Sequence, residues 1–364
     1  MAKNEILSND LLEIVNSDII DWENFNDSTI FITGATGLIG SLIVRTIQTR
    51  NKLYSSNIKL CLLVRSKEKG INLFGDDQNI KYIENSVEEF IPANIDIDYI
   101  IHAASPTKSK FFVERPVETI NTAVFGTQKM LELARINSVK SMIYLSSMEM
   151  YGTMKSDNVK ENDFGYIDVK NVRSCYPEGK RISELYSYCY SQEYGVPVKI
   201  ARIAQTFGPG IDVINENRVY KFFADSILAK RNIVLKSTGS TIINYGYTTD
   251  VVKGLLCILQ KGINGESYNL VGDKTGMTIL DSAKWLAEEF GEGQVEVVID
   301  IPKENAGFAP DNNMVLDNEK IRSLGWYPSH DLKDGYRRLL EYMKIEYMNV
   351  QKEDNCTSKV KKIV

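Results

Sequence analysis

The chain has 364 residues, of which 43% are hydrophobic and 25% charged, and its formal net charge is −5. This composition is typical of a globular protein with one large or two modest cores, and it excludes disordered and fibrous proteins. The net negative charge offers no general attraction for nucleic acid or anionic lipid, so we expect no nucleic-acid or membrane partner.

Short features of the sequence narrow the class further. The first twenty residues contain acids throughout and no apolar run ahead of a cleavage site, and no later stretch reaches the length of a membrane span. The five cysteines have no C-x-x-C spacing, and with only two histidines we expect no metal site. We therefore predict a cytoplasmic protein with reduced thiols.

Residues 1–27 are predicted to form a helical extension. Leu11, Leu12, Val15 and Ile19 recur on one side of an amphipathic helix. Such a helix more often covers a core than recruits a partner, and we expect the first role here.

A glycine-rich turn follows, in "STIFITGATGLIGSLIVRTIQ" at residues 28–48. A short β-branched run precedes the glycines and helical periodicity follows them, which predicts strand, turn and helix. Gly34, Gly37 and Gly40 form G-x-x-G-x-x-G, the spacing that lets a pyrophosphate approach the backbone at a helix N-terminus. A turn that serves only the fold is the alternative for an isolated motif. We expect the turn to bind a dinucleotide through its glycines and through Thr36, Leu38 and Ile39.

The end of the second predicted strand bears on the choice of cofactor. An acid about 20 residues after the glycine loop accepts the ribose 2′-OH of NAD, whereas an arginine there accommodates the 2′-phosphate of NADP. This chain reads "LLVRSKEKG", with Arg65 and Ser66 and no acid before Glu68. The pattern favours NADP(H), with NAD(H) as the alternative, although basic residues at a strand end are often simply solvated.

Strand-like and helix-like segments alternate through the first two hundred residues. Apolar runs at 58–64, 80–83, 98–104, 141–147 and 196–203 read as strands, and residues 117–137 read as a helix. Near-continuous apolar strands that alternate with helices predict a doubly wound parallel sheet of the Rossmann type, in the α/β class.

The stretch "SCYPEGKR" contains the strongest candidates for catalysis. Pro177 suits the first turn of a helix, so Tyr176 lies at a helix start and Lys180 on the same face. A nearby ammonium and the positive nicotinamide of the cofactor both favour tyrosinate, so we expect a lowered pKa for Tyr176, which then exchanges a proton with a substrate hydroxyl. Ser147, at the end of a preceding strand, would hydrogen-bond the same oxygen. In isolation, a Tyr and a Lys at this spacing would more often be a surface pair.

Motifs in this order resemble the extended short-chain dehydrogenase/reductase family, in its NAD-dependent epimerase/dehydratase group. They are "TGATGLIG", "IIHAASP", "NTAVFGTQ", "YLSSMEMYG", "CYPEGKR" and "ARIAQTFGPG", between residues 29 and about 340, and they look closest to the UDP-glucuronate decarboxylase branch. The resemblance implies that Tyr176, Lys180 and Ser147 are catalytic. It further implies cofactor contacts from Ala103, Ala104, Asn121, Tyr176 and Lys180.

The resemblance also bears on the reaction and the substrate. Dehydratases of the group have an Asp-Glu pair after the catalytic Ser or Thr, whereas this chain has Met148 and Glu149, which disfavours dehydration. Glu149 either acts on the substrate or pairs with a neighbour. Arginines that commonly grip the nucleotide diphosphate are replaced by Ile243 and by Asn312-Asn313. The expected substrate contacts are Ser105, Ser147, Met148, Glu149, Gln205, Arg218 and Arg231, of which the two arginines could equally be surface residues.

Residues 28–204 and 245–261 are expected to form the NAD(P)-binding domain and residues 205–244 and 262–343 a smaller α/β substrate domain, with a flexible tail at 344–364. The favoured activity is NADPH-dependent reduction of a keto group in a nucleotide-activated sugar, for example a CDP-linked ketose, for surface polysaccharide synthesis. A redox-neutral 4-epimerase or decarboxylase with tightly bound NAD is the alternative. A non-catalytic dinucleotide sensor is a third reading, which the intact Ser147, Tyr176 and Lys180 disfavour. The resemblance also implies a homodimer, because the predicted helices at 117–137 and 177–194 form the usual dimer surface of the family.

Overall fold

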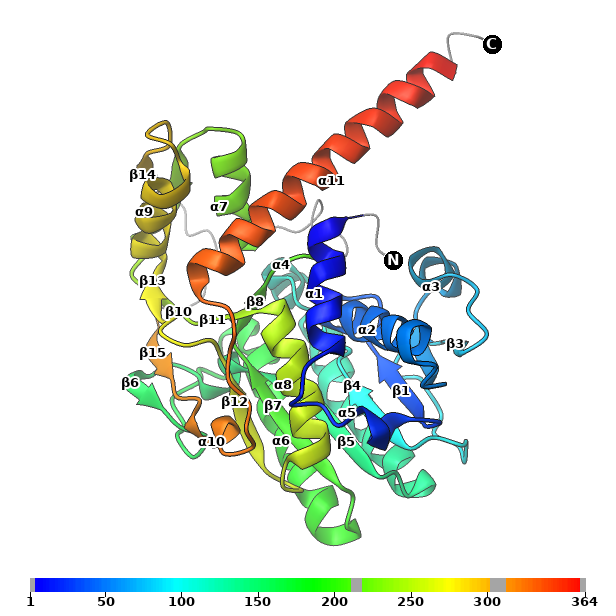
Figure 1. The fold of residues 1–364 in the computed structure, drawn as a ribbon. Helices are drawn as coiled ribbons and strands as arrows, with labels where there is room; N and C mark the ends of the chain where they lie inside the picture. Colours follow the sequence, from blue (N-terminus) through cyan, green and yellow to red (C-terminus); the bar gives the residue numbers. More distant parts are fainter. Residues whose placement is uncertain (1–3, 211–217, 302–311, 361–364) are drawn as a thin grey trace.

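The computed structural model describes residues 4–210, 218–301 and 312–360, with residues 350–360 described by their backbone alone. A parallel seven-stranded sheet lies at its centre, in the order β12-β7-β5-β4-β1-β2-β3 (Figure 1). Its strands are β1 (Thr29–Thr33), β2 (Lys59–Val64), β3 (Ile80–Glu84), β4 (Tyr99–His102), β5 (Ser141–Ser147), β7 (Val198–Ile203) and β12 (Ser267–Leu270). The strand order reverses between the adjacent strands β1 and β4, which is where ligands bind in open α/β sheets.

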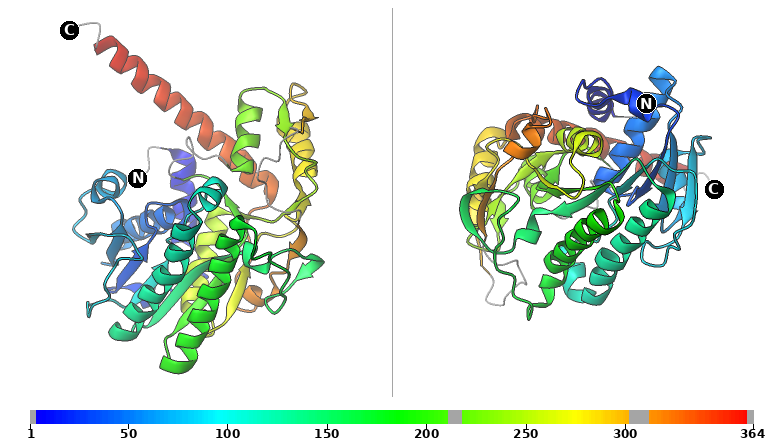
Figure 2. Two further views of the ribbon diagram at one scale, coloured as in Figure 1. Left: turned by 180° about the vertical axis from the view of Figure 1, so that it is seen from behind. Right: turned by 90° about the horizontal axis from the view of Figure 1, so that it is seen from below.

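Alternate residues of most strands enter two different cores. In β1, Ile30 and Ile32 pack on one side of the sheet, whereas Phe31 packs on the other. Both sides are covered by helices, as a parallel sheet requires. On one side lie α5 (Pro116–Asn137) and α6 (Cys175–Tyr194), which run next to each other (Figure 2); on the other lie α2 (Leu38–Tyr54) and α8 (Thr248–Lys261). The predicted α/β fold with a doubly wound parallel sheet is confirmed.

Smaller elements surround the C-terminal edge of the sheet. Four two-stranded ladders pair β6 (Lys155–Val159) with β15 (Asn313–Leu316), β8 (Gln205–Phe207) with β11 (Tyr245–Tyr247), β9 (Ile233–Leu235) with β14 (Val297–Ile299), and β10 (Ile242–Ile243) with β13 (Met277–Thr278). The other helices are α3 (Lys67–Phe74), α4 (Ser109–Glu114), α7 (Val219–Leu228), α9 (Ile279–Phe290), α10 (Glu319–Arg322) and α11 (Leu332–Val360), with short 3₁₀ turns η1 (Trp22–Phe25), η2 (Met148–Tyr151) and η3 (Val172–Ser174). In the described part of the chain, no helix has the length and apolar character to cross a membrane.

Two expected boundaries differ from the structure. β12 lies in the central sheet beside β7, although residues 262–343 were assigned to the substrate domain. Its Tyr268, Asn269 and Leu270 are buried, so the last strand of the central sheet comes from within the segment 262–343. The chain from 344 to 360, expected as tail, continues α11 (Figure 1). This stretch contains no glycine or proline to end a helix.

The N-terminal extension folds as α1 (Glu5–Val15), which packs against α2, α8 and α11. Leu11 and Val15 are buried, as expected, together with Leu7 and Ile14. The helix ends at Val15, four residues before Ile19, so Ile19 contributes from the following turn. The extension therefore covers the core.

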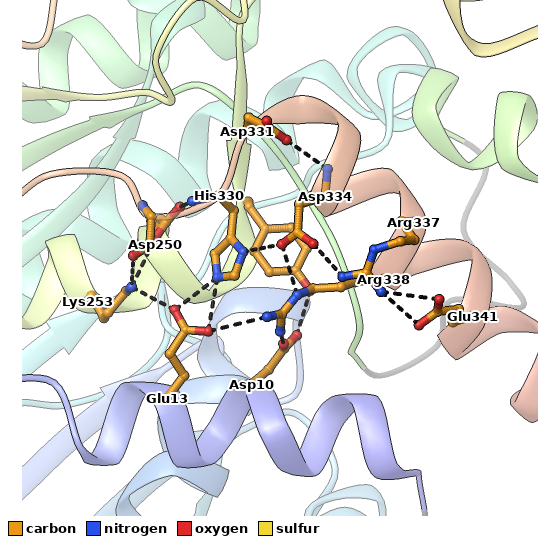
Figure 3. A network of polar contacts seen from close by, with 12 residues as sticks. Asp10, Glu13, Asp250, Lys253, His330, Asp331, Asp334, Arg337, Arg338 and Glu341 are labelled. Atoms are coloured by element: carbon orange, nitrogen blue, oxygen red, sulfur yellow. Dashed lines mark hydrogen bonds and ion pairs between the residues drawn. The ribbon is translucent and has the colours of Figure 1, made fainter. Parts of the chain in front are cut away.

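A network of charged side chains fastens α1 to α8 and to the start of α11 (Figure 3). Both ring nitrogens of His330 face carboxylates, with Nε2 2.9 Å from Glu13 and Nδ1 2.6 Å from Asp334. Lys253 pairs with Glu13 and with Asp250, each at 2.9 Å. Because both partners of the imidazole accept hydrogen bonds, His330 is held as the doubly protonated imidazolium.

We expect this network to make stability depend on pH. Burial lowers the pKa of His330, but the carboxylates of Glu13, Asp250 and Asp334 outweigh it, so the pKa is raised above its ordinary value. A histidine with a raised folded pKa stabilises the fold fully below its unfolded pKa of about 6.5, and the contribution is lost as pH rises through the folded pKa. The pKa values of Glu13 and Asp334 are lowered to about 2, so both carboxylates stay ionised throughout this range.

Urea unfolding of wild type and His330→Gln tests this linkage. The advantage of the wild type in unfolding free energy should shrink as the pH rises above the unfolded histidine pKa of about 6.5 and through the raised folded pKa. An advantage that stays constant over this range would contradict the assignment. The second histidine, His102, does not affect the comparison, because both proteins contain it and its contribution cancels in the difference.

Candidate active site

The glycine turn after β1 leaves room only for backbone. Gly34 has φ of 68°, and a Cβ added there would lie 2.5 Å from the carbonyl oxygen of Ala103. A Cβ at Gly40 would lie 2.3 Å from the carbonyl oxygen of Gly34. The N–H of Gly37 donates to that same carbonyl (3.0 Å), and α2 begins at Leu38, so a helix N-terminus faces the turn. These residues fit the pyrophosphate of a dinucleotide. The other predicted contacts in this turn, Thr36 and Ile39, are half-buried.

The ends of β1 and β4 are locked together beside the turn. The hydroxyl of Thr33 lies 2.8 Å from Nδ1 of His102 and accepts a hydrogen bond from the N–H of Ala104 (3.1 Å). This contact fixes Ala103 and Ala104 against the glycine turn. Their role as cofactor contacts stays a prediction. Ser105 follows, half-buried, and its hydroxyl donates to the carbonyl oxygen of Pro106 (3.1 Å). Asn121 lies half-buried on α5.

The residues after β2 do not decide between NAD and NADP. Arg65 is exposed at the end of β2, and the Ser66 hydroxyl caps α3 by accepting from the N–H of Lys69 (3.2 Å). The carboxylate of Glu84, at the end of β3, reaches the same edge and accepts from the N–H of Lys67 (3.1 Å). An acid therefore lies at the same sheet edge as Arg65, at the end of the neighbouring strand β3 rather than after β2.

Ser147, Tyr176 and Lys180 come together between the end of β5 and the first turns of α6. Tyr176 and Lys180 are 8% and 3% exposed, and the Lys180 Nζ lies 5.8 Å from the centre of the Tyr176 ring. Lys180 donates to the carbonyl oxygen of Leu145 in β5 (2.7 Å), which fixes helix and strand together. The Ser147 hydroxyl accepts from the N–H of Glu149 (3.2 Å) and starts η2.

The electrostatics of this pair differ from the expected lowered pKa of Tyr176. In the polypeptide alone, burial raises the pKa of Tyr176 above its ordinary value, and the charge of Glu149 raises it further. The opposing contributions are smaller and come from the Ser147 hydrogen bond and the charges of Arg173 and Arg218. Burial also lowers the pKa of Lys180 to about 7, against the charge of Glu184. Lys180 points to a backbone carbonyl rather than to the phenol oxygen, so it does not stabilise the phenolate directly.

Glu149 pairs with a residue that sequence reasoning missed. Arg173, in η3, holds the carboxylate with two hydrogen bonds of 2.8 and 3.3 Å. Of the two roles left open for Glu149, pairing with a neighbour is therefore present. Met148 is half-buried and packs against an apolar cluster around Met150 and Tyr151. A usable signal for Arg173 was its place, three residues before Tyr176 at the helix start.

Of the two predicted substrate arginines, only Arg218 approaches the catalytic groups. Arg218 directly precedes α7, lies within hydrogen-bond distance of the Thr206 carbonyl oxygen (3.5 Å), and lowers the pKa of Tyr176. Arg231 is exposed beyond the other end of this ten-residue helix, a length of about 15 Å. Gln205 begins β8, where its N–H donates to the Asn244 carbonyl oxygen (2.9 Å).

A buried ion pair supports the catalytic helix, and sequence reasoning missed it as well. Glu184, one turn after Lys180, receives hydrogen bonds of 2.7 to 3.1 Å from Arg202 in β7 and one of 2.5 Å from Ser146. Arg202 also donates to the hydroxyl of Tyr151 (2.9 Å). An arginine inside the mostly apolar run "VPVKIARI" was the signal for a buried partner.

Comparisons with known proteins identify the family of the chain and similar proteins. The family described as NAD dependent epimerase/dehydratase matches residues 30–271. The chain is 26% identical over 321 residues to UDP-glucuronic acid decarboxylase 1 of Xenopus tropicalis, covering 87% of this chain and 72% of the relative. It is 28% identical over 310 residues to UDP-glucuronic acid decarboxylase 3 of Arabidopsis thaliana, covering 84% and 86%.

Solved structures share the fold. A UDP-glucose 4-epimerase from Thermotoga maritima, solved with UDP-glucose, has a TM-score of 0.73 at 24% identity and covers 88% of this chain and 99% of its own. A dTDP-glucose 4,6-dehydratase from Streptomyces venezuelae, solved with NAD, has a TM-score of 0.70 at 22% identity, covering 87% and 97%.

Proposed function

The chain belongs to the NAD dependent epimerase/dehydratase family, within the extended short-chain dehydrogenases/reductases, and on this premise we propose that it oxidises and then re-reduces a sugar-ring carbon of a nucleotide sugar, using retained NAD. This redox-neutral cycle replaces the NADPH-dependent reduction that Arg65 favoured. The support for the change is that the family is described as NAD dependent and that the relatives named above are decarboxylases. Glu84 at the same edge removes the argument for NADP that rested on Arg65 alone.

The favoured reaction is decarboxylation of a nucleotide-linked uronate, UDP-glucuronate first. The observation that carries it is the Ser147, Tyr176 and Lys180 group beside Glu149, in a chain that aligns with UDP-glucuronic acid decarboxylases over most of its length. Oxidation at C4 gives a β-keto acid, which loses carbon dioxide without an external oxidant and leaves an enolate. A proton from solvent then replaces the lost carboxylate on C5, and the hydride returns to C4.

The chain's own residues divide the work as follows. Tyr176 takes the proton of the C4 hydroxyl and later returns it, since its phenol is the buried acid-base group at the site. Ser147 hydrogen-bonds the same oxygen, and Lys180 holds α6 against β5. Bound at the glycine turn, NAD would accept and return the hydride and would add the positive charge that favours tyrosinate.

The nucleotide diphosphate is proposed to be held by Arg218. Ile243 is buried in β10, and the Asn312 side chain is taken up by hydrogen bonds to the Gly152 carbonyl (2.9 Å) and the Met154 N–H (3.2 Å). The two places where the family resemblance leads us to expect arginines therefore serve packing in this chain. Arg218 is the predicted cation that approaches Tyr176.

Incubation with UDP-glucuronate, without added nicotinamide nucleotide, tests the proposal. We expect release of carbon dioxide and formation of a UDP-pentose, which mass spectrometry detects. If UDP-glucuronate stays unchanged while UDP-glucose is converted to its 4-epimer, the epimerase alternative replaces decarboxylation. If only a keto-sugar nucleotide reacts, with consumption of added NADPH, the redox-neutral cycle is wrong.

We further propose a homodimer formed by α5 and α6. These adjacent helices expose large apolar side chains, including Val117 and Phe125 on α5 and Leu185 and Tyr188 on α6. Paired helices of two copies would bury them. A Leu185→Asp protein should elute as a monomer in size-exclusion chromatography with light scattering, whereas the wild type elutes as a dimer. A monomeric wild type would contradict the proposal.

A cytoplasmic location and a role in surface polysaccharide synthesis stay predictions from the sequence.

A further inference from the structure

The phenol of Tyr176 is covered by a layer made of three separate segments. The ring of Phe112, in α4, stacks on the Tyr176 ring with centroids 4.3 Å apart and planes inclined by 10°. The guanidinium of Arg173 lies 5.7 Å from the Phe112 ring centre, on a side chain that is 13% exposed. The same guanidinium holds Glu149 of η2. Arg173 is thus the group that touches both other members of the layer.

Backbone contacts fix the position of this layer relative to Tyr176. The Cys175 thiol donates to the Phe112 carbonyl oxygen (3.3 Å), which ties α4 to the start of α6. Arg181 donates to the carbonyl oxygens of Met150 and Tyr151 (3.0 and 3.2 Å), which ties η2 to the same helix. With both flanking segments anchored, the Arg173 side chain sets how Glu149 and Phe112 face the phenol.

The charges around Tyr176 give Arg173 a second effect. Glu149 disfavours the phenolate, and Arg173 and Arg218 favour it. The charged or titratable groups that face Tyr176 are Glu149 from η2, Arg173 from η3, Arg218 from the segment before α7, Tyr144 from β5, and Lys180 from its own helix. Without Arg173, the carboxylate of Glu149 would face the phenol unneutralised and would no longer be held in place.

We propose that Arg173 is a positioning residue for Tyr176: its guanidinium closes Phe112 over the phenol ring and holds the Glu149 carboxylate as a neutralised pair. The proposal rests on the proposed function, because it assumes that Tyr176 exchanges the substrate proton. It adds a residue that acts on the reaction through its neighbours.

The pH dependence of kcat/KM for UDP-glucuronate tests this role in the NAD-loaded enzyme. In Arg173→Gln, the acidic limb should move to higher pH by about one unit, because a like charge beside the phenol raises its pKa. The rate should recover toward the wild-type value above that limb, a recovery that a merely structural defect would not show. Glu149→Gln should move the limb to lower pH, and the double variant should return it close to the wild-type position.

A matched control uses another bidentate arginine pair. Arg135 holds Glu132 at 2.6 and 2.9 Å at the C-terminal end of α5, the opposite edge of the sheet from the site. Arg135→Gln should leave the pH profile unchanged. An Arg173→Gln profile that is depressed equally at every pH, or that coincides with the wild type, overturns the proposal.

A second measurement separates this inference from the proposed function. Protein carrying ¹³Cζ-labelled tyrosine is loaded with NAD and titrated by NMR without substrate, and Tyr176→Phe identifies the resonance. The Tyr176 resonance should titrate at higher pH in Arg173→Gln than in the wild type, whichever nucleotide sugar the enzyme accepts. Titration at the same pH in both proteins overturns the positioning role. An inactive wild type whose Tyr176 shifts as expected overturns only the proposed reaction.

Discussion

Replacing Tyr176 with phenylalanine should lower kcat by about 10²- to 10⁴-fold, the range that a positioned acid-base group contributes. Phenylalanine keeps the ring that stacks on Phe112 and removes only the hydroxyl that exchanges the substrate proton. NAD content and thermal stability should stay near the wild-type values, because the glycine turn and the Lys180 contact to Leu145 are unchanged.

The same substitution elsewhere on the helix serves as control. Tyr190 lies on α6 near its C-terminal end, away from Ser147, and Tyr190→Phe should keep wild-type turnover. Single-turnover formation of NADH, read by absorbance, tests the oxidation step itself. A Tyr176→Phe enzyme with undiminished turnover would remove Tyr176 from the mechanism.

Arg202→Met should reduce the free energy of unfolding by about 3–5 kcal/mol, the loss seen when one partner of a buried ion pair is removed. The two side chains are 3% and 7% exposed, so Glu184 would be left charged and buried. Ser146 would remain as its hydrogen-bond donor, and the Tyr151 hydroxyl would lose one partner. Because Glu184 lies one turn after Lys180, the defect should also weaken the catalytic helix.

Denaturant unfolding followed by circular dichroism measures this loss. Arg135→Met breaks an exposed pair and should cost much less. Replacing both partners, in Arg202→Met/Glu184→Leu, should recover part of the stability, since no uncompensated charge stays buried. A loss in Arg202→Met no larger than that in Arg135→Met would show that the buried pair does not hold α6 to β7.

The fold was predictable because its signals are local. Apolar runs such as "IKLCLLV" specify strands buried on both faces, and Gly34 and Gly40 lie where a Cβ would strike backbone. The placement of β12 and the length of α11 were not predictable in the same way. A four-residue strand joins the sheet only through pairing with distant β7, and the polar, charged sequence after residue 351 predicts a tail rather than the continuation of α11.

The parts of the candidate site that were predictable are those whose position follows from a single local motif. Tyr176, Lys180 and Ser147 lie together as expected, because a helix start and a strand end place them. The electrostatics were not predictable, since the pKa of Tyr176 depends on burial and on which acceptor Lys180 meets. Arg173 and Glu184 escaped notice because their partners are distant in sequence, and Arg231 was selected by charge alone although α7 separates it from Arg218.

The central claim is that the enzyme retains NAD and returns the hydride to its substrate. Freshly purified protein is denatured, and the dinucleotide that it releases is identified and quantified by mass spectrometry. The account predicts near-stoichiometric NAD, because an internal redox cycle needs no exchange of cofactor. Release of NADP, or an empty protein that takes up NADPH more tightly than NADH, would contradict it and restore net reduction of a keto group.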